Sequence, residues 1–348
     1  MIDLNDVAAI QAADPQQILN HLLDLPQHLS QGWAAAQAVD LPASFESVDR
    51  IVIAAVGRSA AASALFAALI ANECPFPVTL VRDEDLPAFA AGSRTLVIAV
   101  SASGQAAETL AASDVALSRG CQLLILTHDH ELAQRATEAG ITVLPLEAHG
   151  SIGWTVAALL SVAARLKWSH DFEIDLVEAI DVTRAWSGAF AAESPIAQNL
   201  AKREAGQLMG RWVVVYGAGV LAPVAEYWKQ HINVVAKAWA SAEVMPDAGH
   251  YAPAGTDWPA DNANKVMALF LTGASDRPSN AQRLALLQRT FMLRGCNTDF
   301  MRARGRSPLA QALSLVLAGD LLSFYLAILY GADPASRDAL TTFQADLA

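Results

Sequence analysis

The chain has 348 residues, 53% of them hydrophobic and 17% charged, a length and composition that predict about two globular domains. Its formal net charge of −12 excludes a general attraction to nucleic acid or to an anionic membrane surface, although an anionic small molecule can still bind where the local potential is positive. The three cysteines lie far apart without a metal-binding or redox motif, and acidic residues follow Met1, so we expect a cytoplasmic protein without a secretory signal.

Strand-like and helix-like segments alternate through the first half of the chain. Apolar residues at helical spacing occupy the first part, up to about residue 40. A continuous apolar run at 50–56 then leads through a glycine into a helical stretch at 60–71. A second run at 96–100 leads through a serine-rich loop into a helical stretch at 106–119. Further short strands are expected at 78–81, 123–126 and 143–144. Apolar strands that alternate with helices predict a parallel sheet covered by helices on both faces.

The same pattern begins again in the second half. The apolar run 211–216 leads through Gly217-Ala218-Gly219 into a helical stretch, and another buried strand follows at 266–271. The amphipathic segment 171–204 separates the two halves. The sequence therefore predicts two flavodoxin-like, doubly wound α/β domains, each a mostly parallel sheet with helices on both faces. The expected domains are 1–170, with the N-terminal helices, and 171–348, with a linker helix and the C-terminal helices.

The segment 309–330 is apolar and long enough to cross a bilayer. Small or polar residues interrupt it near its centre, namely Gln311, Gly319, Asp320 and Ser323. We therefore expect a helix that is buried inside a soluble protein and does not enter a membrane.

A phosphate cradle is predicted at residues 101–105, which read Ser-Ala-Ser-Gly-Gln after the second long strand. Ligands of open parallel sheets bind at the carboxyl ends of the strands, where small residues and helix N-termini present N–H groups to an anion. The expected phosphate-binding residues are Gly57, Arg58, Ser59, Ser101, Ser103, Gly104 and Gln105. The alternative is that the serines only cap helices. The loop has no P-loop lysine and no complete dinucleotide-binding glycine pattern.

Several short motifs follow one another along the chain in an order that a known protein family shares. They are Gly57-Arg58-Ser59-Ala60, the loop and helix start 101–109, Trp228-Lys229, the segment 246–250 and the segment 319–334. In these motifs the chain resembles the bifunctional phosphoglucose/phosphomannose isomerases, from about residue 49 to residue 347. The resemblance implies two sugar-isomerase (SIS) domains that bind a phosphorylated sugar without a metal or an organic cofactor. It also implies a homodimer whose active sites lie at the subunit interface, with the histidine donated by the neighbouring chain.

The resemblance breaks at the residues that carry the chemistry. His250 stands at the position of the family's ring-opening histidine, but Val234 falls where the family has the glutamate that acts as base. His149 stands at the position of a family arginine, Gln344 at that of a lysine, and Ala106 at that of a threonine in the phosphate loop. The resemblance therefore implies that the phosphate end of the site is mostly kept and the chemical end mostly replaced, the change to Val234 being the weightiest because valine cannot carry a proton.

Two functions remain open from the sequence. The chain binds a sugar phosphate in carbohydrate metabolism, with the family's aldose–ketose isomerase activity lost or altered. Alternatively, it is an active phosphosugar isomerase in which His250 opens the ring and a relocated base, Glu243 or Asp247, moves the proton. Each of these two carboxylates could instead be a solvated surface charge. No metal site is expected, because no third ligand accompanies His128 and His130.

Overall fold

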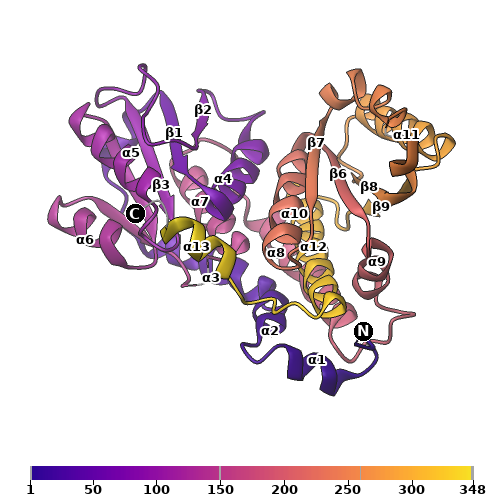
Figure 1. Ribbon diagram of the computed structural model, residues 1–348. Helices are drawn as coiled ribbons and strands as arrows, with labels where there is room; N and C mark the ends of the chain where they lie inside the picture. Colours follow the sequence, from indigo (N-terminus) through magenta and orange to yellow (C-terminus); the bar gives the residue numbers. More distant parts are fainter. Residues whose placement is uncertain (1, 149, 259, 346–348) are drawn as a thin grey trace. The chain divides into compact units, whose positions relative to one another are not determined.

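The computed structural model describes residues 2–148, 150–258 and 260–345, and the chain divides into two compact units. One unit, here called the sheet-A unit, is Leu25–Ile180. The other, the sheet-B unit, combines Met1–Asp24 with Asp181–Ala348. Helix α8 (Glu173–Phe190) carries the chain from the first unit into the second. Figure 1 shows that each unit has its own sheet with helices packed against it.

The N-terminal residues belong to the sheet-B unit, whereas the sequence suggested a single division near residue 170. Helices α1 (Val7–Ala13) and α2 (Ile18–Leu23) lie in this segment. The ammonium group of Lys202 donates to the carbonyl of Leu4 at 2.7 Å, and the N–H of Ile196 donates to the Asn5 side chain at 3.0 Å. These bonds join positions almost 200 residues apart in the chain, so no local sequence pattern indicates them.

Sheet A is entirely parallel, with the strand order β2-β1-β3-β4-β5. The strands are β1 (Arg50–Ala55), β2 (Val78–Val81), β3 (Thr95–Ser101), β4 (Gln122–Thr127) and β5 (Thr142–Pro145). Helices α5 (Ala107–Ser118) and α6 (His130–Glu138) pack on the face that carries Val52, Val97 and Ile125. Helices α3 (Leu25–Ala38), α4 (Gly57–Ile70) and α7 (Ile152–Arg165) pack against one another on the other face. The predicted flavodoxin-like order is therefore confirmed.

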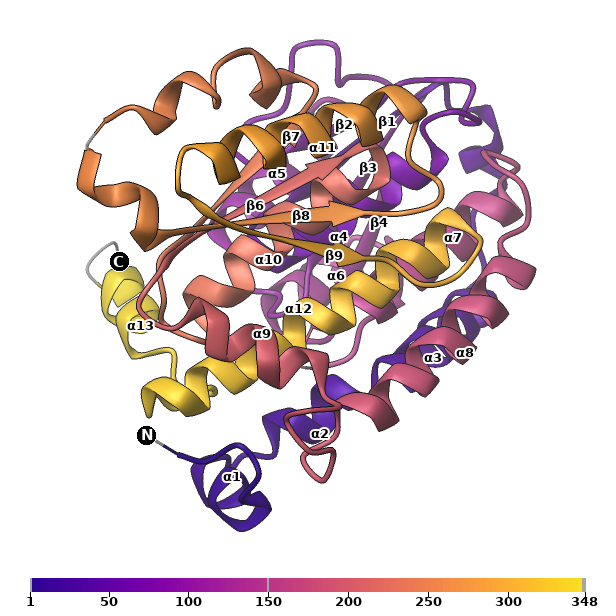
Figure 2. The ribbon, with the colours of Figure 1, turned by 90° about the vertical axis from the view of Figure 1, so that its right-hand side faces the viewer.

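Sheet B repeats this topology with one strand fewer, in the parallel order β7-β6-β8-β9. The strands are β6 (Trp212–Ala218), β7 (Ala240–Met245), β8 (Val266–Thr272) and β9 (Asn297–Arg302). Figure 2 shows α11 (Pro278–Leu293) on one side of this sheet, and α12 (Pro308–Tyr330) and α9 (Leu200–Leu208) on the other. Helix α10 (Ala222–Val234) joins β6 to β7 and packs against α12. The predicted internal duplication of architecture is confirmed.

The remaining elements of the described ranges are short. They are the 3₁₀ segments η1 (Ala43–Ser47), η2 (Gly219–Leu221), η3 (Asp247–His250), η4 (Ala254–Thr256) and η5 (Ala260–Lys265), and the helix α13 (Asp338–Ala345). Segments η3 and η4 follow β7 and lie on the α11 side of sheet B, where Ala248 packs in the same apolar cluster as Leu287 and Phe291. This side of sheet B is therefore covered by one helix and an irregular segment.

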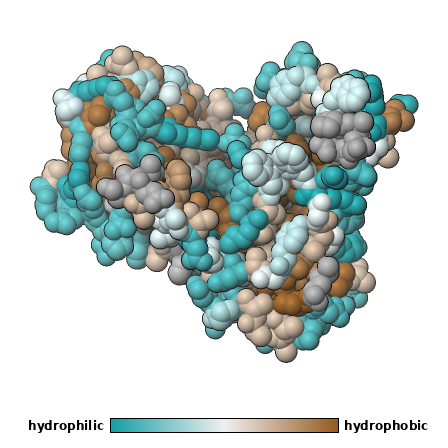
Figure 3. Space-filling model, viewed as in Figure 1, coloured by the Kyte–Doolittle hydropathy of each residue, from teal (hydrophilic) through white to brown (hydrophobic). Residues whose placement is uncertain are grey.

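Helix α12 is the apolar segment that has the length of a membrane span, and the protein itself buries it. The polar residues that interrupt it have partners: the Gln311 amide oxygen accepts the N–H and the hydroxyl of Ser275, and the Asp320 carboxylate accepts the hydroxyl of Tyr227 at 2.7 Å. A Cβ atom at Gly319 would lie 2.3 Å from the indole nitrogen of Trp228, so only glycine permits this approach of α10. In Figure 3, hydrophilic residues cover much of the drawn surface and hydrophobic ones form scattered patches.

Helix α9 carries two buried charged side chains, one fully hydrogen-bonded and one not. Lys202 donates to the carbonyls of Leu4, Ala192 and Ser194 at 2.7–2.9 Å, so its ammonium group is fully hydrogen-bonded. Glu204 is only 3% exposed, and among the described residues its Oε2 atom has no hydrogen-bond partner. Burial raises the pKa of Glu204 to about 7, and the negative charge of Asp299 adds to the shift while Arg203 opposes it.

This buried carboxyl predicts a pH-dependent stability. The folded protein holds the Glu204 proton up to about pH 7, whereas the unfolded chain releases it near the ordinary value of 4.5. Stability from this group is therefore present at low pH and falls as pH rises through that window. In Glu204→Gln the side chain stays neutral, so the melting temperature near pH 8 should exceed that of the wild type by at least about 2 °C. Differential scanning calorimetry between about pH 4 and pH 8 measures this.

The matched control is Glu138→Gln, which neutralises an exposed carboxylate on α6 that accepts a hydrogen bond from the Gln134 amide. It should leave the pH dependence of the melting temperature unchanged. If Glu204→Gln melted lower than the wild type at pH 8, the buried carboxylate would be stabilising, and the argument from desolvation would be wrong.

Candidate functional site

The predicted phosphate-binding residues lie at the carboxyl edge of sheet A. Strands β1 and β3 are neighbours there, with Ala55 opposite Val100. The strand order reverses at this pair, because β2 lies beyond β1 on one side and β4 lies beyond β3 on the other. The chain leaves β1 into α4 on one face and leaves β3 into α5 on the opposite face. This is the topological switch point, where doubly wound sheets have the crevice that receives a ligand.

The turn from β1 into α4 brings a helix N-terminus directly to this crevice. Gly57, with φ +57°, is the first residue of α4, and Ser59 lies in the first turn, half-buried beside Arg58. The N-cap residue is Val56, whose apolar side chain cannot accept a hydrogen bond from the first N–H groups of the helix. These N–H groups and the positive end of the helix dipole suit a bound anion.

The loop from β3 into α5 is fixed by Gly104. Ser101 is the buried last residue of β3, whereas Ser103 is exposed. Gly104 has φ +64°, its N–H donates to the Ser101 carbonyl at 3.1 Å, and its carbonyl accepts the N–H of Leu132 at 3.0 Å. A Cβ atom at this position would lie 2.1 Å from the Asp129 carbonyl oxygen, so the loop can only pack here with glycine.

The N-caps of α4 and α5 bear on the alternative that the serines only cap helices. The N-cap of α5 is Ala106 and that of α4 is Val56, so none of Ser59, Ser101 and Ser103 caps either helix. The Ser103 hydroxyl accepts the N–H of Gln105 at 3.3 Å, which keeps its own proton free to donate. The register thus brings two uncapped helix N-termini and their serines to neighbouring strand ends.

Thr109, in the first turn of α5, is a residue that the site prediction did not include. It is 1% exposed, and among the described residues its hydroxyl has no hydrogen-bond partner. A buried hydroxyl without a partner costs free energy, and such groups often mark a ligand or water position. The signal in the sequence was its place five residues after Gly104, on the helix that the loop opens.

The residues expected to carry the chemistry lie at opposite edges of sheet B. His250 is the exposed last residue of η3, which follows the carboxyl end of β7, and Asp247 is the first residue of the same 3₁₀ segment. Val234 is the half-buried last residue of α10, which leads into the amino end of β7. The six residues of β7 span about 20 Å, so within one chain Val234 and His250 are far apart. The Lys237 ammonium group donates to the Val234 carbonyl at 2.6 Å and closes this helix end.

Glu243 lies within β7, two residues before its end, and is half-buried. Its carboxylate accepts the hydroxyl of Tyr251 at 2.7 Å, and this bond raises the pKa of Tyr251 to about 12. The Glu243 side chain lines a cavity on the α11 side of the sheet together with Tyr216 and Phe291. The structure thus places Glu243 on a face of the sheet and His250 beyond the carboxyl end of the same strand.

The structure does not place His149 or Gln344 in the site. His149 lies outside the described residues. Gln344 is exposed on α13, a helix without buried residues. Within the described ranges, no group of three or more His, Cys, Asp or Glu side chains is placed to hold a metal ion.

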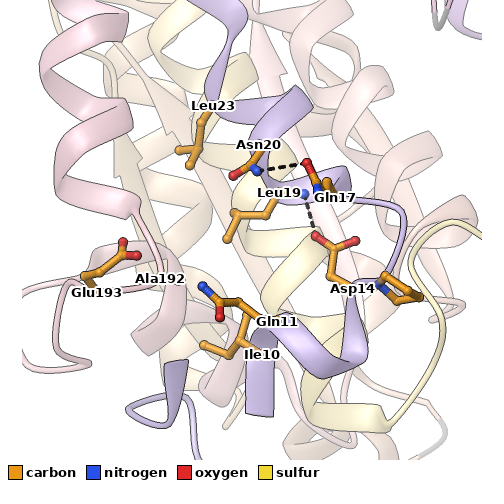
Figure 4. Close-up of a pocket in the computed structure, with 10 residues that line it drawn as sticks. Ile10, Gln11, Asp14, Gln17, Leu19, Asn20, Leu23, Ala192 and Glu193 are labelled. Atoms are coloured by element: carbon orange, nitrogen blue, oxygen red, sulfur yellow. Dashed lines mark hydrogen bonds between the residues drawn. The ribbon is translucent and has the colours of Figure 1, made fainter. Parts of the chain in front are cut away.

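A separate cavity of about 360 Å³ lies beside α1 and α2 in the sheet-B unit (Figure 4). Asp14 accepts the N–H groups of Ile18 and Leu19 at 2.8 and 2.9 Å and thereby caps α2. Glu193 is the other acidic residue of the lining. Because both charged groups are acidic and Asp14 already serves the backbone, this cavity does not suit a phosphate.

Comparisons with known proteins agree with this geometry. A family model described as the bacterial phospho-glucose isomerase C-terminal SIS domain matches residues 197–347, and one described as the SIS domain matches residues 44–166. The chain is 29% identical over 318 residues to the bifunctional phosphoglucose/phosphomannose isomerase of Caldicellulosiruptor bescii, which covers 89% of this chain and 93% of that protein. Identity to the protein of the same name in Thermoplasma volcanium is 27% over 300 residues, 86% of this chain and 92% of that one.

A solved structure supports the fold. The C-terminal domain of glucosamine-fructose-6-phosphate aminotransferase from Francisella tularensis superposes with a TM-score of 0.70 over 91% of this chain and 97% of that chain, at 14% identity. The two SIS matches fall on the two parallel sheets, and the similarity to the named isomerases runs through both. The chain therefore consists of two SIS domains, the second of the bacterial phospho-glucose isomerase C-terminal type, and it is similar over most of its length to bifunctional phosphoglucose/phosphomannose isomerases.

Proposed function

We propose that the protein binds a sugar phosphate at the β1–α4 and β3–α5 loops, and that the aldose–ketose isomerase activity of its family is lost or altered. The observation that carries the proposal is a contrast between two parts of the chain. Two uncapped helix N-termini meet at the switch point of sheet A, whereas the position of the family's base is occupied by Val234. Binding needs only the helix N-termini, whereas isomerisation also needs a base, which valine cannot provide.

The phosphate would be held mainly by neutral donors. The hydroxyls of Ser59, Ser101 and Ser103 and the first N–H groups of α4 and α5 would donate to its oxygens, while the dipoles of the two helices offset its charge. Arg58, in the first turn of α4, and Gln105, before α5, would contribute longer side chains at the rim of the crevice. A locally positive site of this kind is compatible with the net charge of −12.

Isomerisation of a sugar phosphate has three requirements: opening of the ring, transfer of a proton between the first two carbons, and stabilisation of the enediolate. His250, which is exposed, is suited to the first because imidazole exchanges protons near neutral pH. The second requires a base against the carbon, and Val234 cannot act as one. Typical contributions of a general base are about 10²–10⁴ in rate, so its loss alone makes turnover slow.

The positions of Val234 and His250 favour a homodimer. A site that combines both sequence positions cannot form from one copy of sheet B, because β7, which is about 20 Å long, runs from the edge near Val234 to the edge near His250. We infer that a neighbouring chain supplies His250 to a site at the subunit interface. The assembly would act in the cytoplasm.

A second candidate is an active isomerase with a relocated base, and the geometry of η3 favours Asp247 for that role. Asp247 and His250 are three residues apart in one 3₁₀ turn, where side chains at this spacing lie one above the other. Glu243 is the less suitable alternative, since its carboxylate already accepts the hydroxyl of Tyr251.

Sugar-phosphate binding is tested by thermal shift and calorimetry with glucose 6-phosphate and mannose 6-phosphate. A ligand that binds only the folded chain raises the melting temperature. Ser103→Ala and Ser101→Ala should each weaken binding about 10- to 100-fold, as expected for a lost hydrogen bond to a charged group. Ser118→Ala, which removes an exposed hydroxyl at the far end of α5, should leave binding unchanged. Equal affinities of all variants would place the phosphate elsewhere.

Catalysis is tested by coupled conversion of glucose 6-phosphate and mannose 6-phosphate to fructose 6-phosphate. The wild type should show little or no turnover, and Val234→Glu alone should restore only a small part, because catalytic groups that act as a unit are strongly non-additive. Robust wild-type turnover that disappears in His250→Ala would contradict the proposal. In that case Asp247→Asn and Glu243→Gln would identify the base.

A further inference from the structure

A cavity of about 300 Å³ lies on the α11 face of sheet B and has a composition unlike that of the phosphate loops. Its floor is formed by alternate residues of β6 and β7, and its walls by α11 and the segment after η3. The aromatic side chains of the lining are Tyr216, Tyr251, Trp258 and Phe291. The cavity belongs to the sheet-B unit, whereas the phosphate loops belong to the sheet-A unit. Its size falls at the lower end of the range for small-molecule pockets.

The charge of this cavity is negative. Glu243 is the one charged side chain among the described lining residues. Its Oε2 atom accepts the hydroxyl of Tyr251 at 2.7 Å, and within the described part of the chain its Oε1 atom has no protein partner. A half-buried carboxylate without a neighbouring cation repels a phosphate and attracts a positively charged group.

Tyr216 supplies an independent observation. It is 4% exposed and its ring is fixed by a stacked contact with Phe270, at 4.9 Å between centroids, and an edge contact with Phe291, at 5.7 Å. Its side chain lines the cavity, and its hydroxyl is not one of the fully buried, unpartnered atoms of the described residues. Burial and the nearby charge of Glu243 raise its pKa, so it remains a neutral phenol. Buried tyrosine hydroxyls usually have a partner, and a molecule in the cavity can provide one for Tyr216.

The polar groups of the lining define the chemistry of the ligand. Glu243 Oε1, the Tyr216 hydroxyl and the Ser241 hydroxyl can each accept one hydrogen bond, and a primary ammonium group has three N–H bonds to donate. The faces of the aromatic rings stabilise the same charge through cation–π contacts. The rest of the lining, including Val214, suits a short apolar body. We propose that this cavity binds a primary ammonium ion with a short apolar body, its nitrogen directed at Glu243.

The exposed part of the cavity lining suits a ligand with an apolar body. Trp258 lines the cavity and is 82% exposed, an unusual state for the largest apolar side chain. A ligand whose hydrocarbon part rests on this indole would remove apolar surface from water on both partners. An ion that is small and fully hydrated, such as free ammonium, would not use this wall.

The test compares 2-phenylethylamine, which is cationic at neutral pH, with 2-phenylethanol, which has the same shape and no charge. In isothermal titration calorimetry on the full chain, the amine should bind at least about tenfold more tightly than the alcohol, as expected for a hydrogen bond to a charged group. Tetramethylammonium, which carries the charge without N–H donors, should bind more weakly than the amine. Equal affinity of amine and alcohol, or no heat from the amine up to about 10 mM, would overturn the proposal.

Variants distinguish specific binding of the amine in this cavity from nonspecific adsorption to the protein surface. Glu243→Gln should lower the affinity for the amine about 10- to 100-fold and hardly change the affinity for the alcohol. Tyr216→Phe should lower the affinity for the amine by about threefold or more. Glu138→Gln removes one exposed carboxylate on α6 and should leave the affinity unchanged, which controls for net charge. If Glu243→Gln fails to fold, the wild-type comparison of amine and alcohol still decides. An amine affinity that is unchanged in folded Glu243→Gln would refute the site.

Discussion

The reversal of strand order between β1 and β3 is the constraint on which the candidate phosphate site depends. In a parallel sheet all carboxyl ends lie at one edge, and each strand is followed there by the positive end of a helix. After β1 the chain continues into α4 on one face of the sheet, and after β3 it continues into α5 on the other face. In doubly wound sheets this arrangement leaves a crevice between the N-termini of the two helices. This backbone geometry suits an anion even in a protein whose net charge is −12.

The parts of the fold that the sequence predicts are those with a continuous apolar pattern. Strands β1, β3 and β8 are buried along nearly their whole length, and their predicted ranges agree with the structure to within about two residues. The edge strands β7 and β9 were not predicted, because each is half-exposed and carries a charged residue, Glu243 in β7 and Asp299 in β9. Edge strands are typically short and polar, which removes the signal on which the prediction depends.

The same distinction applies to the sites. The phosphate loops are contiguous in sequence, so seven residues in two short segments could be named without a structure. The cavity on sheet B combines residues from β6, β7, the segment after η3 and α11, and its key pair, Glu243 and Tyr251, is joined only by the fold. The sequence offers Glu243 only as a candidate base seven positions before His250. Its hydrogen bond to Tyr251 gives it a physical role that spacing cannot indicate.

The proposed contrast between a kept phosphate end and a replaced chemical end would have a physical basis. Phosphate recognition at the switch point is spread over several backbone N–H groups and hydroxyls, so many side-chain changes leave most of the binding free energy in place. Proton transfer depends on a single carboxylate at a single position, so one substitution removes it. A chain that is 27–29% identical to these isomerases can therefore retain their fold and phosphate binding while its reaction is lost or changed. Binding and turnover must accordingly be measured separately, because either one can be present in this fold without the other.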